Sequence, residues 1–180
     1  MSKPQTDNSY LADKIALRLN NIPQKEALNI CDAFAGKGTI WANIKKKYDG
    51  KINITRFDKE AKSEDFSFIG NNVKFLTAMD LKNFDVIDLD AYGLPYEQLK
   101  IIFDKNFKGI VFVTFIQTRM GMLPIEFLID LGYTKKMIEK CPTLFGKKGF
   151  EKVTLWLALH GVKKIKCRQH ARKNYLAFNL

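Results

Sequence analysis

Acidic residues placed directly after short apolar runs are the side chains best suited to chemistry in this sequence. Residues 28–32 form such a run, which ends in Asp32 and is followed by Gly36 and Gly38. Two closely spaced glycines let the backbone turn sharply and approach a ligand, and a helix that follows them points its N–H groups at that ligand. The segment therefore predicts a strand, a ligand-binding loop and the start of a helix.

This loop does not fit the common phosphate-binding patterns. The dinucleotide pattern GxGxxG needs a third small residue where the helix packs on the strand, and Trp41 occupies that position. No GxxxxGKS or GxxxxGKT segment is present, so a P-loop is excluded. Three well-separated cysteines and two histidines argue against a zinc module and a disulfide scaffold. The alternative to a ligand-binding loop is a structural turn without a ligand.

Apolar runs and turn residues place the acids at the ends of expected strands. Strands are expected over residues 28–32, 51–58, 72–76, 84–90 and 109–115, and helices over residues 39–48, 60–69, 95–104 and 147–160. Alternating strands and helices indicate a parallel sheet with right-handed crossovers. Only two residues separate the runs 162–169 and 172–179, and so short a link joins only antiparallel strands. The sequence predicts one α/β domain over residues 1–180, with residues 1–25 as an N-terminal extension.

A parallel sheet closed by an antiparallel β-hairpin is the layout of Rossmann-like class I methyltransferases, which depend on S-adenosylmethionine (SAM). The segment Asp32-Ala-Phe-Ala-Gly-Lys-Gly-Thr39 resembles their first motif, an acid followed by FxGxG. The resemblance implies that SAM is the cofactor, that Asp58 accepts the ribose hydroxyls, and that Asp80 contacts the adenine amino group. The cofactor-binding residues implied in this way are Asp32, Phe34, Ala35, Gly36, Gly38, Asp58, Lys59, Asp80 and Leu81.

The loop after the fourth expected strand, Asp88-Leu-Asp-Ala-Tyr-Gly93, resembles the DLDPFG or DLDPYG segment of tRNA guanine N2-dimethyltransferases. Ala91 replaces the proline of that pattern. In such enzymes a carboxylate and a carbonyl orient an exocyclic amine, and an aromatic ring stacks on the extruded base. The resemblance implies that Asp90 holds the amine, Tyr92 packs on the base and Asp88 supports them. The alternative is a simple turn, with Asp88 as a buried strand acid paired with a lysine.

The positive charge of the chain is concentrated in its last third. The net charge is +11, yet residues 1–116 contain 17 basic and 15 acidic residues, whereas residues 117–180 contain 13 and 4. Basic groups bind phosphates and interleaved aromatic residues stack on bases, so this third predicts contact with nucleic acid, with residues 117–149 as a recognition segment. The basic residues expected at this interface are Arg119, Lys147, Lys148, Lys163, Lys164, Lys166, Arg168 and Arg172. The lysines of residues 163–166 have an alternative role, the protection of an exposed strand edge.

The sequence therefore predicts a SAM-dependent methyltransferase that acts on nucleic acid, at an exocyclic base nitrogen and without a metal. Two alternatives stay open: a methyltransferase of a protein or small molecule, and a non-catalytic protein of the same fold that binds nucleic acid as a subunit. The apolar run of residues 109–115 is too short to span a membrane, and the first ten residues are polar. We therefore expect a cytoplasmic protein.

Overall fold

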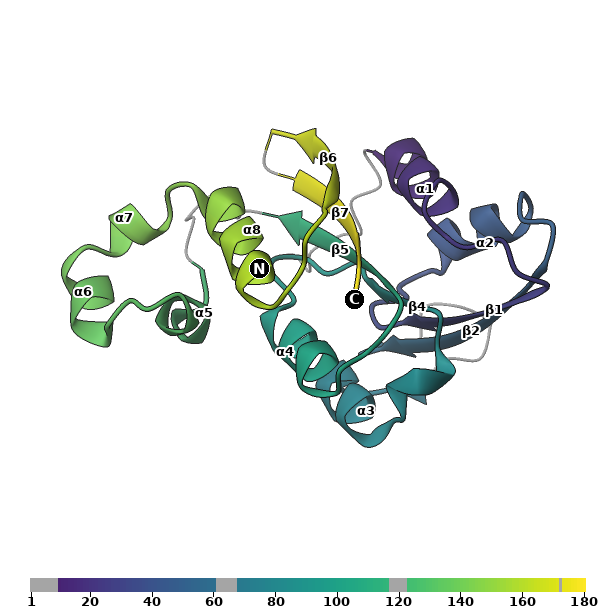
Figure 1. The fold of residues 1–180 in the computed structure, drawn as a ribbon, viewed down its shortest axis with the longest axis horizontal. Helices are drawn as coiled ribbons and strands as arrows, with labels where there is room; N and C mark the ends of the chain where they lie inside the picture. The colour runs from purple at the N-terminus through teal and green to yellow at the C-terminus, as the bar shows by residue number, and fades with distance from the viewer. Residues whose placement is uncertain (1–9, 61–67, 117–122, 172) are drawn as a thin grey trace.

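A seven-stranded sheet in the order β3-β2-β1-β4-β5-β7-β6 forms the centre of the protein (Figure 1). The computed structural model describes residues 10–60, 68–116, 123–171 and 173–180. The parallel strands are β1 (Ala27–Asp32), β2 (Lys51–Asp58), β3 (Phe68–Ile69), β4 (Val86–Leu89) and β5 (Ile110–Ile116). The strands β6 (Lys166–His170) and β7 (Lys173–Asn179) form the predicted antiparallel hairpin, and β7 pairs with β5. The predicted fold class is confirmed.

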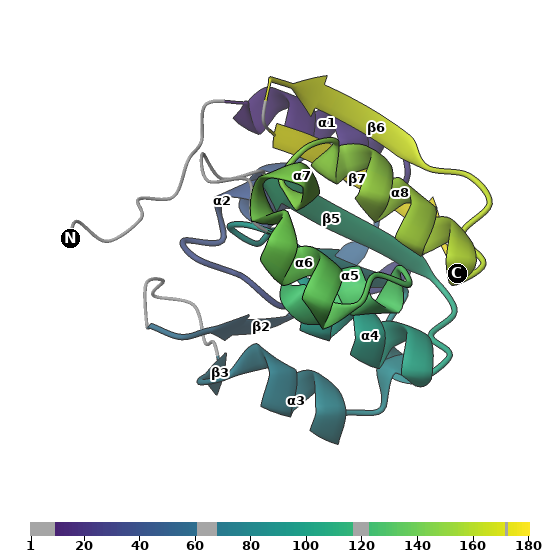
Figure 2. The ribbon, with the colours of Figure 1, turned by 90° about the vertical axis from the view of Figure 1, so that its left-hand side faces the viewer.

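Helices cover both faces of this sheet (Figures 1 and 2). The helices α1 (Leu11–Leu19) and α2 (Thr39–Lys45) lie on one face, and α3 (Asn72–Ala78), α4 (Tyr96–Asp104) and α8 (Gly149–Leu159) lie on the other. A 3-10 turn, η1 (Leu81–Asn83), precedes β4. The short helices α5 (Ile125–Asp130), α6 (Lys135–Lys140) and α7 (Pro142–Phe145) lie together at one side of the sheet.

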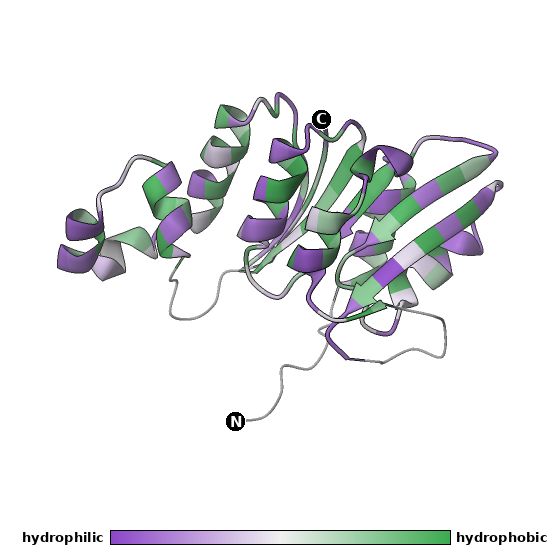
Figure 3. Cartoon of the chain, turned by 90° about the horizontal axis from the view of Figure 1, so that it is seen from below, coloured by the Kyte–Doolittle hydropathy of each residue, from purple (hydrophilic) through white to green (hydrophobic). Residues whose placement is uncertain are grey.

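The two sheet faces bury separate clusters of apolar side chains, which is why β4 and β5 read as nearly continuous apolar runs. Trp41 of α2 packs edge-on against Phe112 on the α1–α2 face. Trp156 of α8 packs against Tyr96 and Phe103 of α4 on the other face. Hydrophobic residues concentrate in the strands and on the helix sides turned toward them (Figure 3). This packing fixes the strand ends that carry the acidic residues.

Two expected elements differ from the structure. The expected strand over residues 72–76 is wrong, because this segment is the helix α3, with Asn72 and Leu76 buried four residues apart and Asn71 capping the Val73 N–H. The third parallel strand is instead the two-residue β3, so the expected helix over residues 60–69 is wrong at its end. Its residues 61–67 lie outside the described residues.

Within the N-terminal extension of residues 1–25, the helix α1 packs on the sheet. Its sequence, LADKIALRL, presents Leu17 and part of Ile15 to the apolar cluster beneath it. No helix in the described part of the chain is long and apolar enough to cross a membrane.

Candidate active site

The carboxyl ends of β1, β2 and β4 surround a cavity of about 380 Å³. Ligands of open α/β sheets bind at the carboxyl ends of the parallel strands. The structure brings most of the residues singled out in the sequence into its wall: Asp32, Phe34, Ala35, Gly36, Gly38, Asp58, Lys59, Asp88, Asp90 and Tyr92. Lys14, Trp41, Asn72 and Ile116 line the same cavity. The acids that are distant in sequence therefore meet at one site.

The glycine loop has the backbone conformation that its sequence predicts. Gly36 and Gly38 have φ angles of 52° and 68°, which favour glycine, and Gly38 is the residue before the first turn of α2. The Gly36 N–H donates to Oδ2 of Asp58 over 2.7 Å, and the Glu60 N–H donates to Oδ1 over 3.0 Å. Asp58 thus ties the end of β2 to the loop after β1 and keeps its carboxylate at the cavity wall.

Asp32 is a buried carboxyl group whose hydrogen-bonding capacity is unused within the described residues. It is 4% exposed and lines the cavity, and it receives no side-chain hydrogen bond or ion pair from the described part of the chain. Burial, followed by the charges of Asp88 and Asp90, raises the pKa of Asp32 well above its usual value, although Arg18 and Arg56 oppose this shift. A cationic group of a ligand would restore the charged form.

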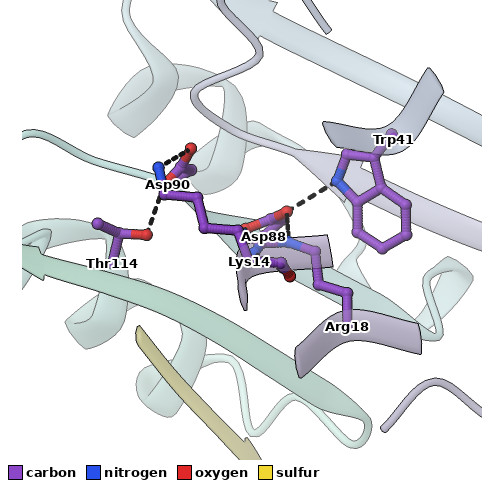
Figure 4. Close-up of polar contacts among 6 residues, drawn as sticks. All are labelled: Lys14, Arg18, Trp41, Asp88, Asp90 and Thr114. Carbon is purple, nitrogen blue, oxygen red and sulfur yellow. Dashed lines mark hydrogen bonds and ion pairs between the residues drawn. The ribbon is translucent and has the colours of Figure 1, made fainter. Parts of the chain in front are cut away.

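Asp88 has the opposite surroundings, because all its bonds are made within the protein (Figure 4). Arg18 binds it in a two-point contact, with Nε 2.7 Å from Oδ2 and Nη2 2.6 Å from Oδ1. The indole N–H of Trp41 donates to the same Oδ2 over 2.7 Å. Asp88 is a buried, paired strand acid, and its partner is an arginine rather than the lysine considered from the sequence.

Asp90 is held by Lys14 and Thr114 (Figure 4). The Lys14 ammonium lies 2.8 Å from Oδ1 and 2.9 Å from Oδ2, and the Thr114 hydroxyl donates to Oδ1. Burial alone would raise the pKa of Asp90, but the charges of Arg18 and Lys14 and the hydrogen bonds from Lys14 and Thr114 hold it below its usual value. Asp90 therefore carries a fixed negative charge at the cavity wall.

Lys14 and Arg18 are site residues that the sequence analysis did not identify. Four residues span about 6 Å along a helix and two residues span about 6.6 Å along an extended chain, so cations four apart on α1 match acids two apart at the end of β4. Both cations are buried, and Arg18 Nη1 also donates to the Lys14 carbonyl. The signal was present as two basic residues, four apart, on an otherwise apolar helix face.

Asp80 and Leu81 lie elsewhere, which corrects their expected place in the cofactor site. They follow α3 and precede β4, at the amino ends of the parallel strands, and neither lines the cavity. Asp80 accepts the Lys82 N–H at the start of η1, and Leu81 is buried in the apolar core. Asn72, the first residue of α3, follows β3 and lines the cavity. Its side-chain amide donates to the Ala33 carbonyl.

Tyr92 stands at the rim of the cavity with 64% of its surface exposed. Together with Phe34 and Ala91 it also borders a second cavity of about 650 Å³, which residues of α3 and α4 line. Tyr92 is thus placed to contact a molecule that reaches the site from outside.

The predicted basic residues divide between the carboxyl ends and the amino ends of the parallel strands. Trp156 near the end of α8 packs on Tyr96, and His160 after it stacks on Phe103 at the end of α4, so α8 runs in the same direction as α4. Lys147 and Lys148 precede the start of α8 and therefore lie toward the cavity side. Lys163 and Lys164 precede β6, which runs in the same direction as β5. They therefore lie toward the amino ends of the parallel strands, away from the cavity. The described residues of this set, which also include Lys166 and Arg168, are all exposed, whereas Arg119 and Arg172 lie outside the described residues.

Solved structures share this fold at low sequence identity. A SAM-dependent methyltransferase from Archaeoglobus fulgidus is 10% identical with a TM-score of 0.55, over 94% of each chain. A precorrin-6y C5,15-methyltransferase from Geobacter metallireducens is 10% identical with a TM-score of 0.55, over 92% of this chain and 86% of that one. A candidate rRNA methylase from Clostridium thermocellum is 12% identical with a TM-score of 0.55, over 97% of this chain and 99% of that one.

No protein-family model and no curated protein sequence matches the chain. At these identities the structural similarity establishes the fold, which is that of the Rossmann-like class I methyltransferases. Two of the three names state a substrate, and the two substrates differ: precorrin-6y in one and rRNA in the other. The substrate of this chain therefore has to be argued from its own residues.

Proposed function

We propose that this protein is a SAM-dependent methyltransferase that acts on nucleic acid at an exocyclic base nitrogen. The carrying observation is the set of acids at the carboxyl ends of β1, β2 and β4 around one cavity, behind a loop of two glycines with positive φ. The names of several structural neighbours, which describe SAM-dependent methyltransferases, support SAM as the methyl donor.

The cofactor half of the site consists of Asp32 and Asp58. SAM supplies an activated methyl group on a sulfonium, together with an amino group, a carboxylate and a ribose. Asp58, already fixed by Gly36, would accept the ribose hydroxyls. Asp32, which has no counterion among the described residues, would receive a cationic group of the cofactor. A buried carboxylate is unfavourable without a counterion and forms a strong ion pair when a cation binds. This is expected of a site that binds a charged ligand.

The acceptor half consists of Asp90 and Tyr92. An amine that attacks a methyl group develops positive charge, and a nearby fixed carboxylate stabilises that charge while it orients the nitrogen. Asp90 is ionised and faces the cavity, and Tyr92 offers an exposed ring for stacking against a base. This role for the loop is favoured over a simple turn because both side chains line the cavity.

A nucleic acid is the proposed partner because the chain has an excess of 11 positive charges, most of it in the last third. The cavity-side pair Lys147 and Lys148 would bind phosphates near the target, and Lys163 and Lys164 would contact a longer strand. Charge reversal of Lys147 and Lys148 to glutamate should weaken binding of a short single strand more than reversal of Lys163 and Lys164. Equal effects of the two double variants would argue against this placement of the strand.

Two measurements test the proposal. Calorimetry with SAM and with NAD should show binding of SAM alone, and binding of NAD alone would overturn the cofactor assignment. Incubation with labelled SAM and either RNA or DNA from the host, followed by nucleoside analysis, should yield a base methylated on its amino group. Transfer of label to protein or to a small molecule would support the alternative substrates. SAM binding without any transfer would support the non-catalytic alternative.

A further inference from the structure

Lys14 is a buried cation at the acceptor end of the cavity whose hydrogen-bonding capacity is only partly used. Its side chain is 6% exposed, and its ammonium lies 5.2 Å from the centre of the Tyr175 ring. An ammonium has three N–H donors. Within the described residues its hydrogen bonds go only to the two oxygens of Asp90, which leaves one donor without an acceptor. Because Lys14 lines the cavity, that donor is available to a molecule bound there.

Asp90 also has one unused position. Each carboxylate oxygen accepts about two hydrogen bonds. From the described residues, Oδ1 receives Lys14 and Thr114 and is complete, whereas Oδ2 receives Lys14 alone. The pair therefore offers the cavity one acceptor, Oδ2 of Asp90, directly beside one donor, Nζ of Lys14. Its charges cancel, so a neutral group can bind there without an uncompensated buried charge.

We propose that Lys14 and Asp90 together select a target amine that is flanked by a ring nitrogen with a free lone pair. This inference rests on the proposed function and specifies its substrate. The amine N–H would donate to Oδ2 of Asp90, and the ring nitrogen would accept from the Lys14 ammonium. Cytosine, with N4 beside N3, and adenine, with N6 beside N1, present this pair of atoms on their Watson–Crick edges.

Guanine fits this pair poorly. Its amine N2 lies beside N1, which carries a hydrogen on the Watson–Crick edge, so the Lys14 ammonium would meet a donor rather than an acceptor. The other neighbour of N2 is N3, which lies on the edge next to the sugar. The resemblance of the loop to guanine N2-methyltransferases therefore does not extend to the base, because Lys14 is part of this site.

Single-turnover methyl transfer from SAM tests this selection with the wild-type chain. The substrates are single strands of uridine or thymidine that contain one cytosine, one adenine or one guanine. We expect cytosine or adenine to react at least about tenfold faster than guanine, the discrimination typical of one pair of base contacts. Guanine reacting as fast as both would overturn the selection and leave the proposed function intact. Absence of transfer to every strand would overturn the proposed function as well.

Removal of the ring nitrogen alone tests the contact to Lys14. Strands with 3-deazacytosine or 1-deazaadenine keep the amine but lack the neighbouring acceptor. The wild type should lose about tenfold in rate on the deaza base, as expected for a lost hydrogen bond to a charged donor. The Lys14→Met variant should treat the normal and deaza bases alike, and Lys14→Arg should restore part of the difference. An unchanged wild-type rate on the deaza base would overturn the proposal.

Lys25→Met is the matched control. Lys25 also pairs with an aspartate, Asp85, but Asp85 lies directly before β4, at the end of the strand away from the cavity. This variant should keep the wild-type preference for the normal base. SAM affinity and thermal unfolding, measured on each variant, report whether Lys14→Met is folded. If it is not, the wild-type comparison of normal and deaza bases still decides the proposal.

Discussion

The two halves of the cavity treat their carboxyl groups in opposite ways. At β1, Asp32 is buried without a partner in the described chain and its pKa is raised, whereas at β4 both Asp88 and Asp90 are bound by buried cations of α1. A buried acid without a counterion is a binding group for a cationic ligand. A buried acid with one is fixed in position and charge. The contrast separates the residues expected to bind the cofactor from those that shape the acceptor end.

Breaking the inner ion pair should have the largest effect. Arg18→Met leaves Asp88 buried without its counterion, and such a loss costs about 3–5 kcal/mol of unfolding free energy. Lys25→Met is the control, because its pair with Asp85 is half-exposed and should contribute at most about 1 kcal/mol. Urea unfolding of both variants measures the difference. Equal stability of the two would mean that α1 does not anchor the acceptor half.

The acceptor carboxylate is tested next, by Asp90→Asn. This change keeps the shape of the side chain but removes its charge, so we expect turnover to fall about 10²-fold, a loss of about 3 kcal/mol in transition-state stabilisation. SAM binding should persist, because the cofactor half is untouched. Single-turnover methyl transfer measures the rate, with the exposed Asp49→Asn as the matched control. A wild-type rate for Asp90→Asn would remove Asp90 from the reaction.

On the cofactor side, Asp58→Ala removes the acceptor that would hold the ribose. We expect SAM to bind more weakly by about 1.5–3 kcal/mol, the usual value of hydrogen bonds to a charged group. Calorimetry measures this affinity, and Asp49→Ala should bind SAM like the wild type. Because Asp58 also receives the Gly36 N–H, thermal unfolding should be measured alongside. Unchanged SAM affinity would shift the ribose away from β2.

The smallest effect is expected from Asp32→Asn and depends on pH. The raised pKa means that the folded chain favours protonated Asp32. Asp32 therefore stabilises the fold at low pH, and this contribution is lost as the pH rises through the pKa that Asp32 has in the folded state. The asparagine variant should therefore be more stable than the wild type at about pH 8 and similar to it at about pH 4. Urea unfolding at both values checks this. SAM should bind the variant more weakly, and tighter binding would contradict the assignment.

Much of the fold and of the cavity could be predicted from the sequence, because local patterns carry that information. Apolar runs that end in acids placed Asp32, Asp58 and Asp90 at strand ends, and the two glycines marked the loop between β1 and α2. The third strand could not be placed, because β3 is only two residues long and α3 has apolar residues at positions 73, 75 and 76 that also suit a strand. This error placed Asp80 at the carboxyl ends of the strands, whereas it lies at their amino ends.

The α1 contacts could not be predicted for a different reason. Nothing local to residues 11–19 indicates that Lys14 and Arg18 match two acids far along the chain, since the match depends on where α1 packs in the assembled fold. Charge counting drew attention to residues 117–180, whereas these two cations lie near the start of the chain and are buried in the site. Long-range charge pairing becomes visible only when the elements have been assembled.

The sequence separations of 70 and 76 residues between these partners have a consequence for synthesis. The first helix leaves the ribosome long before β4 exists, so its lysine and arginine stay hydrated until the acids emerge. Closing so long a loop is entropically costly and slow compared with local contacts. The docking of α1 should therefore be a late folding event, and the candidate site is completed by a segment that was synthesised well before β4.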